Sequence, residues 1–450
     1  MKKRTFTVSE KFPSVHMAYD GGPQGMPIPP LLQFYRLSKQ QWLAPDLLDQ
    51  LQLKMLSALL RNTYRNVRYY KTLFDSAGVK IDAIRAADDL MKVPITQRTV
   101  LQTLSVKDIV KTNVNLRRSK KILTAGSTGS PLMVYRTRRE DNRYDVVWAR
   151  AFTADGARLR DTYGDYHAYR SIRKRWFEHL GIWRRVMIPT LETNERKARI
   201  IERANPDVIR GDPFEVVTLA RTVREKNIRG IKPRLVFTMG SRLDKQSRSF
   251  IEASLDTTVY DIYGSTELGC IAWECPMRSG YHINADTVIV EVIKEDGSRT
   301  SIGERGRLIC TGLIAQTMPF IRYDTGDIGV RTEEACSCGR GLPLIRSIEG
   351  RADDFLVAAN GELLPPSVIA NRVKLTPGLV QFRIVQENLL QTKVELVLER
   401  RLLGQRQIVT RILNELMGPE VEIKVELVSS IPYDSSGKIR AIVSKVSQCS

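Results

Sequence analysis

One segment of the chain combines the residue types that bind a polyphosphate. ILTAGSTGSPLMVYR (residues 122–136) places small, hydroxylated and turn-forming residues between two strand-like flanks. Glycine lets backbone N–H groups approach phosphate oxygens closely, and Ser and Thr add hydroxyl donors. Ser127, Thr128 and Ser130 supply such donors, with Gly126 and Gly129 beside them. The segment lacks the Gly-Lys-Ser/Thr ending of a Walker A loop, and taken alone a Ser/Gly surface turn is the commoner interpretation.

A second segment, YDIYGSTELG (residues 260–269), reads as a buried strand that runs into Gly264. Polar residues then follow at the carboxyl end of the strand, which is where α/β sheets bind ligands. Thr266 and Glu267 lie at this carboxyl end, and the ring of Tyr263 could stack on a base. A carboxylate oxygen suits Mg²⁺, so Glu267 is the candidate magnesium ligand. The alternative is a turn in which Ser or Thr caps a helix.

A third segment, RYDTGDIG (residues 322–329), predicts a tight, glycine-flanked turn between apolar runs. Asp327 lies in this turn, and its carboxylate could accept hydrogen bonds from both hydroxyls of a ribose. An aspartate that merely forms a reverse turn is the alternative, because aspartate is common in such turns.

The fourth segment, IPYDSSGKIR (residues 431–440), lies close to the end of the chain. Lys438 is carried there on a glycine-containing loop. A mobile lysine could reach negative charge that develops on a reacting group elsewhere in the protein. A solvated loop lysine is the commoner case.

Cysteine and histidine offer a candidate metal site. Cys275 and His282 are separated by six residues, and Cys336 and Cys338 form a CSCG turn. Three thiolates and one imidazole make a good tetrahedral set for structural Zn²⁺. The two halves are far apart in the sequence, so buried free cysteines are the alternative.

Composition limits the classes of protein to consider. The chain has 450 residues, of which 42% are hydrophobic and 27% charged, and its formal net charge is +20. No apolar run is long enough for a membrane span, and we expect no transmembrane segment and no secretory signal. Six irregularly spaced cysteines predict a reducing, cytoplasmic setting. The basic residues are dispersed and no nucleic-acid signature occurs, so solvated faces are favoured over nucleic-acid binding.

Alternating strand and helix patterns predict an α/β fold. Residues 46–74 read as one amphipathic helix, and residues 212–226 as another. Residues 233–240 and 257–264 read as buried strands, and residues 286–313 as a hairpin. Near residue 350 the pattern changes to that of a small α+β unit. We therefore expect a domain at residues 1–349 and a second at residues 350–450.

Taken together, these segments resemble the signature of the adenylate-forming superfamily, which contains the acyl-CoA synthetases. TAGSTGSP, YGSTE, YDTGD and PYDSSGKIR occur in the order of its phosphate, adenine, ribose and lysine motifs, and GRADDFLVAANGELLPPSVI (350–369) resembles its hinge. LLRNTYRNVRYYKTLFDSAGV, ANPDVIRGDPFEV, INADTVIVEVI and CSCGRGLPLI resemble the phenylacetate–CoA ligase-like branch, which includes CapK-like proteins. Some members of this branch are similar at the cysteine and histidine positions, which favours zinc.

The resemblance implies a large N-terminal adenylation domain with mixed β-sheets and a small, mobile C-terminal lid. It also implies a role for each matching residue. Residues 161–176 would flank the acid pocket, and Gly361 would lie beside the pantetheine arm of CoA. The other roles are phosphate binding by Ser127, Thr128 and Gly129, adenine and AMP binding by Gly240, Ser241, Tyr263, Gly264 and Thr266, Mg²⁺ binding by Glu267, ribose binding by Asp327 and Arg351, the hinge at Asp353, and catalysis by Lys438 with Thr266 and Glu267.

The implied activity is that of an AMP-forming acid ligase. ATP and Mg²⁺ would adenylate a carboxylic acid, aromatic in the nearest branch, and CoA would then form the thioester. The alternatives are transfer to a carrier-protein phosphopantetheine or to an amine, in a secondary-metabolite or polysaccharide pathway. A non-catalytic nucleotide-binding protein, and a membrane-surface protein acting through the basic, aromatic residues 170–186, are further alternatives. A homodimer is left open.

Overall fold

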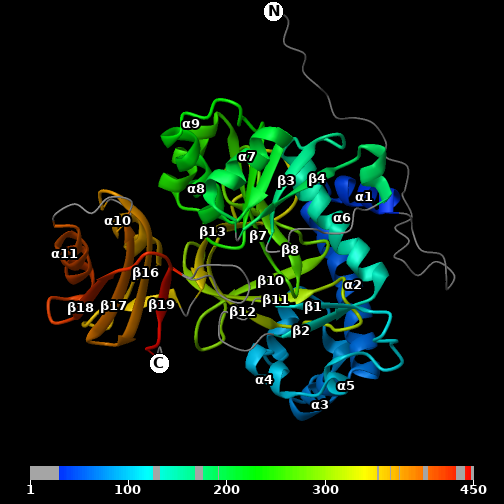
Figure 1. Cartoon of the computed structure of the whole chain (residues 1–450). Coiled ribbons are helices and arrows are strands. Elements are labelled where there is room, and N and C mark those ends of the chain that lie inside the picture. Colours follow the sequence, from blue (N-terminus) through cyan, green and yellow to red (C-terminus); the bar gives the residue numbers. More distant parts are fainter. Residues whose placement is uncertain are drawn as a thin grey trace, which may run out of the picture.

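The computed structural model describes most of the chain (Figure 1). Five predicted site residues lie outside the described part, so their roles rest on the sequence; they are Ser127, Thr128, Gly129, Asp353 and Lys438. The described residues are 30–124, 132–167, 176–190, 192–351, 354–364, 366–373, 376–398, 404–431 and 441–446.

An eleven-stranded mixed sheet forms the centre of the larger part of the molecule (Figure 1). The strand order is β10-β11-β12-β13-β9-β8-β7-β6-β5-β3-β4. The five strands from β4 to β7 are parallel, and every pairing from β7 through β8 to β10 is antiparallel. The strands are β3 (Thr162–His167), β4 (Arg184–Pro189), β5 (Val208–Gly211), β6 (Leu235–Met239), β7 (Thr258–Ser265), β8 (Gly269–Glu274), β9 (Tyr281–Ile283), β10 (Val288–Ile293), β11 (Arg305–Gly312), β12 (Tyr323–Arg331) and β13 (Leu344–Arg351).

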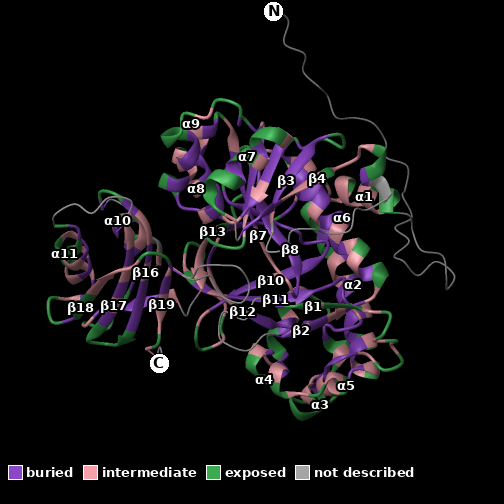
Figure 2. Cartoon of the chain, in the orientation of Figure 1, coloured by how far each residue is buried: buried purple, intermediate pink, exposed green. Residues whose placement is uncertain are grey.

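Helices cover both faces of the parallel half, and many residues of its strands are buried (Figure 2). On one face α6 (Arg138–Ala154) packs against the sheet through Tyr144, Val147 and Phe152. On the other face lie α7 (Asn194–Ala204), α8 (Pro213–Glu225) and α9 (Lys245–Leu255), which connect β4, β5, β6 and β7 in turn. Thr193, Asp212 and Asp244 cap these three helices by accepting a backbone N–H bond.

The N-terminal helices pack against the antiparallel half of the sheet. Residues 46–74 form two helices instead of the predicted one, because Val67 has an extended backbone with φ −121°. The break turns Tyr70 and Phe74 into the same cluster as Leu56 and Leu59. The helices are α1 (Pro30–Gln40), α2 (Pro45–Asn66), α3 (Arg68–Ser76), α4 (Arg98–Thr103) and α5 (Val106–Ile109), with 3-10 turns at Ile81–Ala83, Ala87–Lys92 and, later, Trp176–Leu180.

Two further strands carry the predicted phosphate loop. β1 (Lys120–Leu123) and β2 (Met133–Arg136) pair antiparallel, as their sequences predict. Thr124 and Leu132 continue the pairing, since the Thr124 N–H donates to the Leu132 carbonyl at 2.9 Å. The ends of residues 125–131 are therefore held together, although those residues are not described.

The C-terminal part builds a separate hydrophobic core (Figure 1). This core begins at Leu356 and ends at Ile442. We propose the domain boundary near residue 350, because β13 ends at Arg351, just before this second core begins. Its elements are a β14 (Leu356–Val357) and β15 (Leu363–Leu364) hairpin, α10 (Pro366–Val373), α11 (Gln405–Met417) and a sheet of order β18 (Glu422–Leu427), β17 (Gln391–Leu398), β16 (Leu379–Asn388) and β19 (Ile442–Ser444). The predicted α/β fold class with a smaller C-terminal unit is confirmed.

A buried ion pair joins α6 to the sheet and predicts a large loss of stability when broken. The Arg150 guanidinium donates to both Asp286 carboxylate oxygens, at 2.5 and 2.8 Å, and both side chains are at most 1% exposed. Arg150→Met leaves the Asp286 charge buried without a partner, so we expect a loss of about 3–5 kcal/mol in the free energy of unfolding. Urea denaturation measures this loss. Arg346→Met is the control, since its pair with Glu334 is exposed, and should cost about 0–1 kcal/mol. Equal losses in the two variants would contradict the prediction.

Candidate active site

The turn after β7 lies where the sheet changes from parallel to antiparallel. β7 and β8 are the antiparallel neighbours at this change, and Thr266 and Glu267 lie in the turn between them. A Cβ on Gly264 would come within 2.4 Å of the Gly269 carbonyl oxygen and 3.1 Å of the Trp148 ring. Only glycine fits there, so the local packing explains this part of YGSTE. The prediction that a strand runs into Gly264 is confirmed.

The predicted adenine and ribose residues come together across the sheet. The Tyr263 hydroxyl donates to the Asp327 carboxylate at 2.6 Å. Arg351 is the direct cross-strand partner of Asp327. The Arg351 guanidinium lies close to the backbone of β12, since a Cβ on Gly326 would be only 2.8 Å from it. Burial raises the pKa of the Asp327 carboxyl, and the Arg351 charge opposes this rise. Burial likewise raises the pKa of the Tyr263 hydroxyl.

The sequence predicted a turn at Asp327. The structure instead places Asp327 inside strand β12. Gly326 has φ +75° and interrupts the strand locally, so the glycine-rich pattern marks an irregularity in a strand. Pairing with β11 on one side and β13 on the other keeps the segment extended. The correction matters for the site, because the strand sets Asp327 and Arg351 side by side on one face.

Glu267 is held by a cation and a phenol. One of its carboxylate oxygens accepts from Arg98 at 3.2 Å and from the Tyr323 hydroxyl at 2.9 Å. The side chain is 5% exposed. Arg98 also donates to the Thr124 hydroxyl at 2.6 Å, which in turn accepts the Leu132 N–H at 2.8 Å. Arg98 thus connects Glu267 to the base of the predicted phosphate loop. A buried carboxylate beside that base fits the chemistry of a magnesium ligand.

Three further predicted residues lie on turns at the carboxyl ends of β6 and β7. Gly240 follows β6 with φ +99°, a conformation that favours glycine. Ser241 donates a short hydrogen bond to Asp212, the cap of α8. Thr266 is partly buried, and its carbonyl accepts from Arg136. Gly361 lies apart from these residues, in the turn between β14 and β15, with φ +85°.

The sequence did not single out Arg98, Tyr323, Asp212 or Arg136. Arg98 follows a segment that is pinned to β12, where the Thr96 N–H donates to the Arg322 carbonyl at 2.9 Å. This contact joins positions more than 200 residues apart, so no local pattern reveals it. Tyr323 stands inside the ribose motif, and strand alternation from Asp327 was the only available signal.

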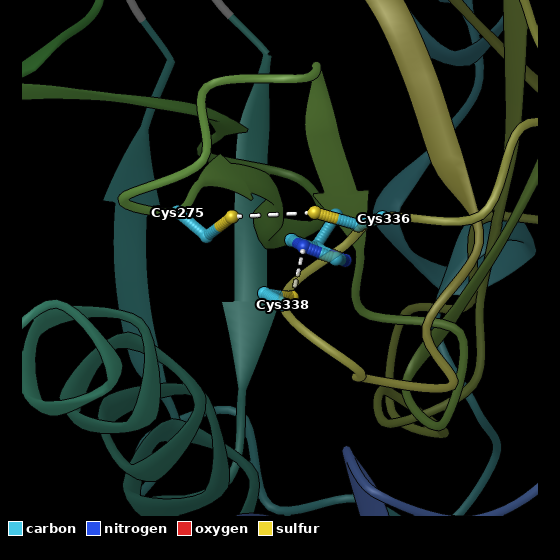
Figure 3. Close-up of side chains that lie close together, drawn as sticks. Cys275, Cys336 and Cys338 are labelled. Carbon is cyan, nitrogen blue, oxygen red and sulfur yellow. Dashed lines mark hydrogen bonds between the residues drawn. The ribbon is translucent and has the colours of Figure 1, made fainter. Parts of the chain in front are cut away.

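The four predicted zinc ligands form one cluster (Figure 3). Their ligand atoms all lie within 4.8 Å of one another. The sulfurs of Cys275 and Cys336 are 3.6 Å apart, and Cys338 lies 3.3 Å from Nε2 of His282. Neighbouring ligands of a tetrahedral zinc ion are separated by roughly 3.5–3.8 Å, so the donor set fits the ion.

The surroundings of the cluster favour a neutral imidazole. Burial lowers the pKa of His282 to about 4, and Nδ1 of its ring lies 3.3 Å from the Leu342 carbonyl oxygen. That contact directs Nε2 towards Cys338. A ring nitrogen fixed by a backbone carbonyl is the usual arrangement behind a metal-binding histidine.

Comparison with known proteins identifies relatives along most of the chain. Residues 356–445 match the model of the CapK C-terminal domain. The phenylacetate–coenzyme A ligase of Thermus thermophilus is 29% identical over 357 residues, which span 75% of this chain and 78% of the relative. That of Escherichia coli K12 is 27% identical over 416 residues, spanning 87% of this chain and 94% of the relative.

Solved structures agree in fold. A 2-hydroxyisobutyryl-CoA ligase in complex with 2-HIB-AMP has a TM-score of 0.75 at 20% identity and covers 90% of this chain and 91% of its own. An anthranilate CoA ligase in complex with anthranoyl-AMP has a TM-score of 0.53 at 14% identity, covering 72% and 66%. The predicted resemblance to the adenylate-forming superfamily and its phenylacetate–CoA ligase-like branch is confirmed. No helix within the described ranges has the length and apolar character of a membrane span.

Proposed function

We propose that this homologue of the phenylacetate–coenzyme A ligases is an ATP-dependent, AMP-forming acid–CoA ligase. The observation that carries the proposal is the convergence of the separate motifs across the large sheet. Tyr263, Asp327 and Arg351 lie together there, and Glu267 is joined through Arg98 to the base of the phosphate loop. Two relatives that are phenylacetate–coenzyme A ligases, and a 2-hydroxyisobutyryl-CoA ligase of similar fold, support the assignment.

In the first half-reaction a carboxylate oxygen of the acid attacks the α-phosphorus of ATP, and the bond to the β-phosphate breaks to release pyrophosphate. Tyr263 lies against the base, and Asp327 and Arg351 hold the ribose. Glu267 would hold Mg²⁺, which would supply positive charge to offset that of the phosphates. Lys438 and the hydroxyls of Ser127 and Thr128 stabilise the charge that develops on the phosphoryl oxygens.

In the second half-reaction a thiol attacks the acyl carbonyl, and AMP leaves. The small domain rotates about Asp353 to exchange the lysine loop for the acceptor. CoA is the acceptor we favour, with Gly361 beside its pantetheine arm. A carrier-protein phosphopantetheine or an amine uses the same acyl-adenylate, so the acceptor must be measured. An aromatic acid is the first candidate because the relatives are phenylacetate–CoA ligases.

Pyrophosphate release across a panel of aryl and alkyl carboxylic acids tests the proposal. The assay contains ATP and Mg²⁺ and is run without and then with CoA. We expect release that requires a particular acid and increases with CoA, together with a matching thioester product. Acid-dependent release that does not change with CoA would support adenylation and indicate that the acyl acceptor is a carrier protein or an amine. ATP binding without release from any acid would contradict the proposal.

We further propose that Cys275, His282, Cys336 and Cys338 bind structural Zn²⁺. The geometry of the cluster supports this, as does its position. Cys275 directly follows β8, and Cys336 and Cys338 precede β13. A bound ion would tie these segments beside β9, which pairs with both strands.

The zinc proposal predicts a variant with less metal and lower stability. Cys336→Ala removes one thiolate, so we expect zinc below stoichiometric amounts in freshly purified protein and a melting temperature several degrees lower. Mass spectrometry of the metal content provides the measurement. Cys270→Ala is the matched control, since Cys270 is also buried but lies outside the cluster. Wild-type protein that already lacks stoichiometric zinc would overturn the proposal.

The location and the assembly state remain predictions. We expect a cytoplasmic protein, on the argument from cysteine usage, and leave a homodimer open. Residues 170–175 of the basic, aromatic segment lie outside the described residues, so the membrane-surface alternative draws no support from the structure.

A further inference from the structure

A partly buried ion pair lies in the parallel half of the sheet, on the face covered by α6. Arg210 of β5 donates to both carboxylate oxygens of Asp165 in β3, at 2.6 and 2.5 Å. The two residues are direct neighbours in the parallel register. Tyr163 lies two positions before Asp165, so its side chain shares the same face.

Aromatic rings connect this pair to the active-site turn. The Trp148 ring lies against Gly264, and it stacks on Phe152 with centroids 6.0 Å apart. Phe152 lies one turn further along α6 and contacts Tyr163, with centroids 6.2 Å apart. The two side chains Trp148 and Phe152 therefore form one wall that leads from the turn after β7 to Tyr163.

The Arg210 guanidinium is fixed at the end of this wall. It lies 4.8 Å from the centre of the Phe152 ring and 4.7 Å from that of Tyr163. Asp145, one turn before Trp148 on α6, adds a second negative charge near it. A guanidinium held by two bonds and two rings cannot rotate away, so this end of the wall is permanently polar.

Tyr163 supplies the recognition group. Its side chain is 2% exposed, and its hydroxyl has no hydrogen-bond partner among the described residues. A buried hydroxyl without a partner costs about 1–3 kcal/mol. A ligand that offers a small polar group at this point removes the cost, and an unsubstituted alkyl or aryl group does not.

We propose that Tyr163, Arg210 and Asp165 form the far end of the acid pocket and select acids with a hydroxyl or amino substituent remote from the carboxylate. The inference rests on the proposed ligase function and specifies its substrate class. The hydroxyl or amino group exchanges a hydrogen bond with the Tyr163 hydroxyl. Arg210 and Asp165 position that phenol and keep the end of the pocket polar.

Matched pairs of acids test the proposal. The pairs are phenylacetate with 4-hydroxyphenylacetate and 4-aminophenylacetate, benzoate with its hydroxy and amino derivatives, and hexanoate with 6-hydroxyhexanoate. In the wild-type enzyme we expect at least one substituted acid to exceed its parent in kcat/KM for pyrophosphate release by about tenfold or more. The substituted acid with the largest increase in kcat/KM over its parent identifies the preferred substituent, hydroxyl or amino.

Tyr163→Phe removes only the hydroxyl and keeps the ring. We expect it to lower kcat/KM for the substituted acid about tenfold more than it lowers kcat/KM for the parent acid. Tyr260→Phe is the control, because Tyr260 is a buried tyrosine of the same core, lies on β7 of the same sheet and contacts Phe237 instead. Melting temperatures of both variants show whether the fold is retained.

The outcomes distinguish a failure of the proposed substrate preference from a failure of the proposed ligase function. Equal rates for parent and substituted acids, or a preference that Tyr163→Phe leaves intact, would overturn this inference and leave the ligase standing. A variant that loses activity equally towards all acids would show a structural role for Tyr163 and would also overturn it. Absence of acid-dependent release throughout would remove the proposed function and this inference with it.

Discussion

Glu267→Gln is expected to lower kcat/KM for acid-dependent pyrophosphate release by about 10²–10³-fold, the range found when one preorganised charge-stabilising group is removed. Gln keeps the size of the side chain and one acceptor oxygen, but it removes the negative charge. Hard cations such as Mg²⁺ prefer carboxylate oxygens. The magnesium concentration needed for half-maximal activity should therefore increase as well.

A second change to the same carboxylate calibrates that result. Tyr323→Phe removes only the 2.9 Å hydrogen bond to Glu267. The net value of such a bond is about 0.5–1.5 kcal/mol, which corresponds to roughly a tenfold effect or less. The magnesium dependence should stay close to that of the wild type. If Glu267→Gln lost no more activity than Tyr323→Phe, the charge of Glu267 would have no special role.

Lys438→Ala is expected to impair adenylation by about 10²-fold or more and to affect thioester formation from preformed acyl-adenylate far less. In the proposed mechanism, Lys438 would stabilise charge on the phosphoryl group only while pyrophosphate leaves. Rotation of the small domain would then take the lysine away from the reacting atoms. The two half-reactions therefore separate its role from a general loss of folding.

The measurement requires both half-reactions on the same preparation. Pyrophosphate release at saturating acid reports the first, and CoA-dependent consumption of synthetic acyl-adenylate reports the second. Lys445→Ala is the control in the same domain, since Lys445 is exposed and pairs with Glu387. Equal losses in the two half-reactions would contradict a role confined to adenylation.

Local patterns predicted the elements that carry the site. The strands that end near Gly240 and Gly264, and the hairpin of β10 and β11, follow from apolar runs bounded by glycine and turn residues. The residues that determine each of these elements are a few neighbours in the sequence. The same holds for the resemblance, because each motif is a short contiguous segment.

Other features depend on contacts between distant segments. Asp327 was expected in a turn, but β11 and β13 hold it in a strand, and β13 begins well after it in the sequence. The helix break at Val67 follows from packing against strands more than 200 residues away. The bond between Arg98 and Glu267 has the same origin. No periodicity within one segment contains these contacts.

The order of strands in the large sheet has a consequence for synthesis on the ribosome. Every strand of that sheet lies between Thr162 and Arg351. Strand β13, made last, is inserted between β9 and β12. The adenine-side and ribose-side strands therefore cannot be joined through the sheet until residue 351 has left the exit tunnel. From then on the nucleotide-binding body can assemble while the lid, with its own core from Leu356 onward, is still being translated.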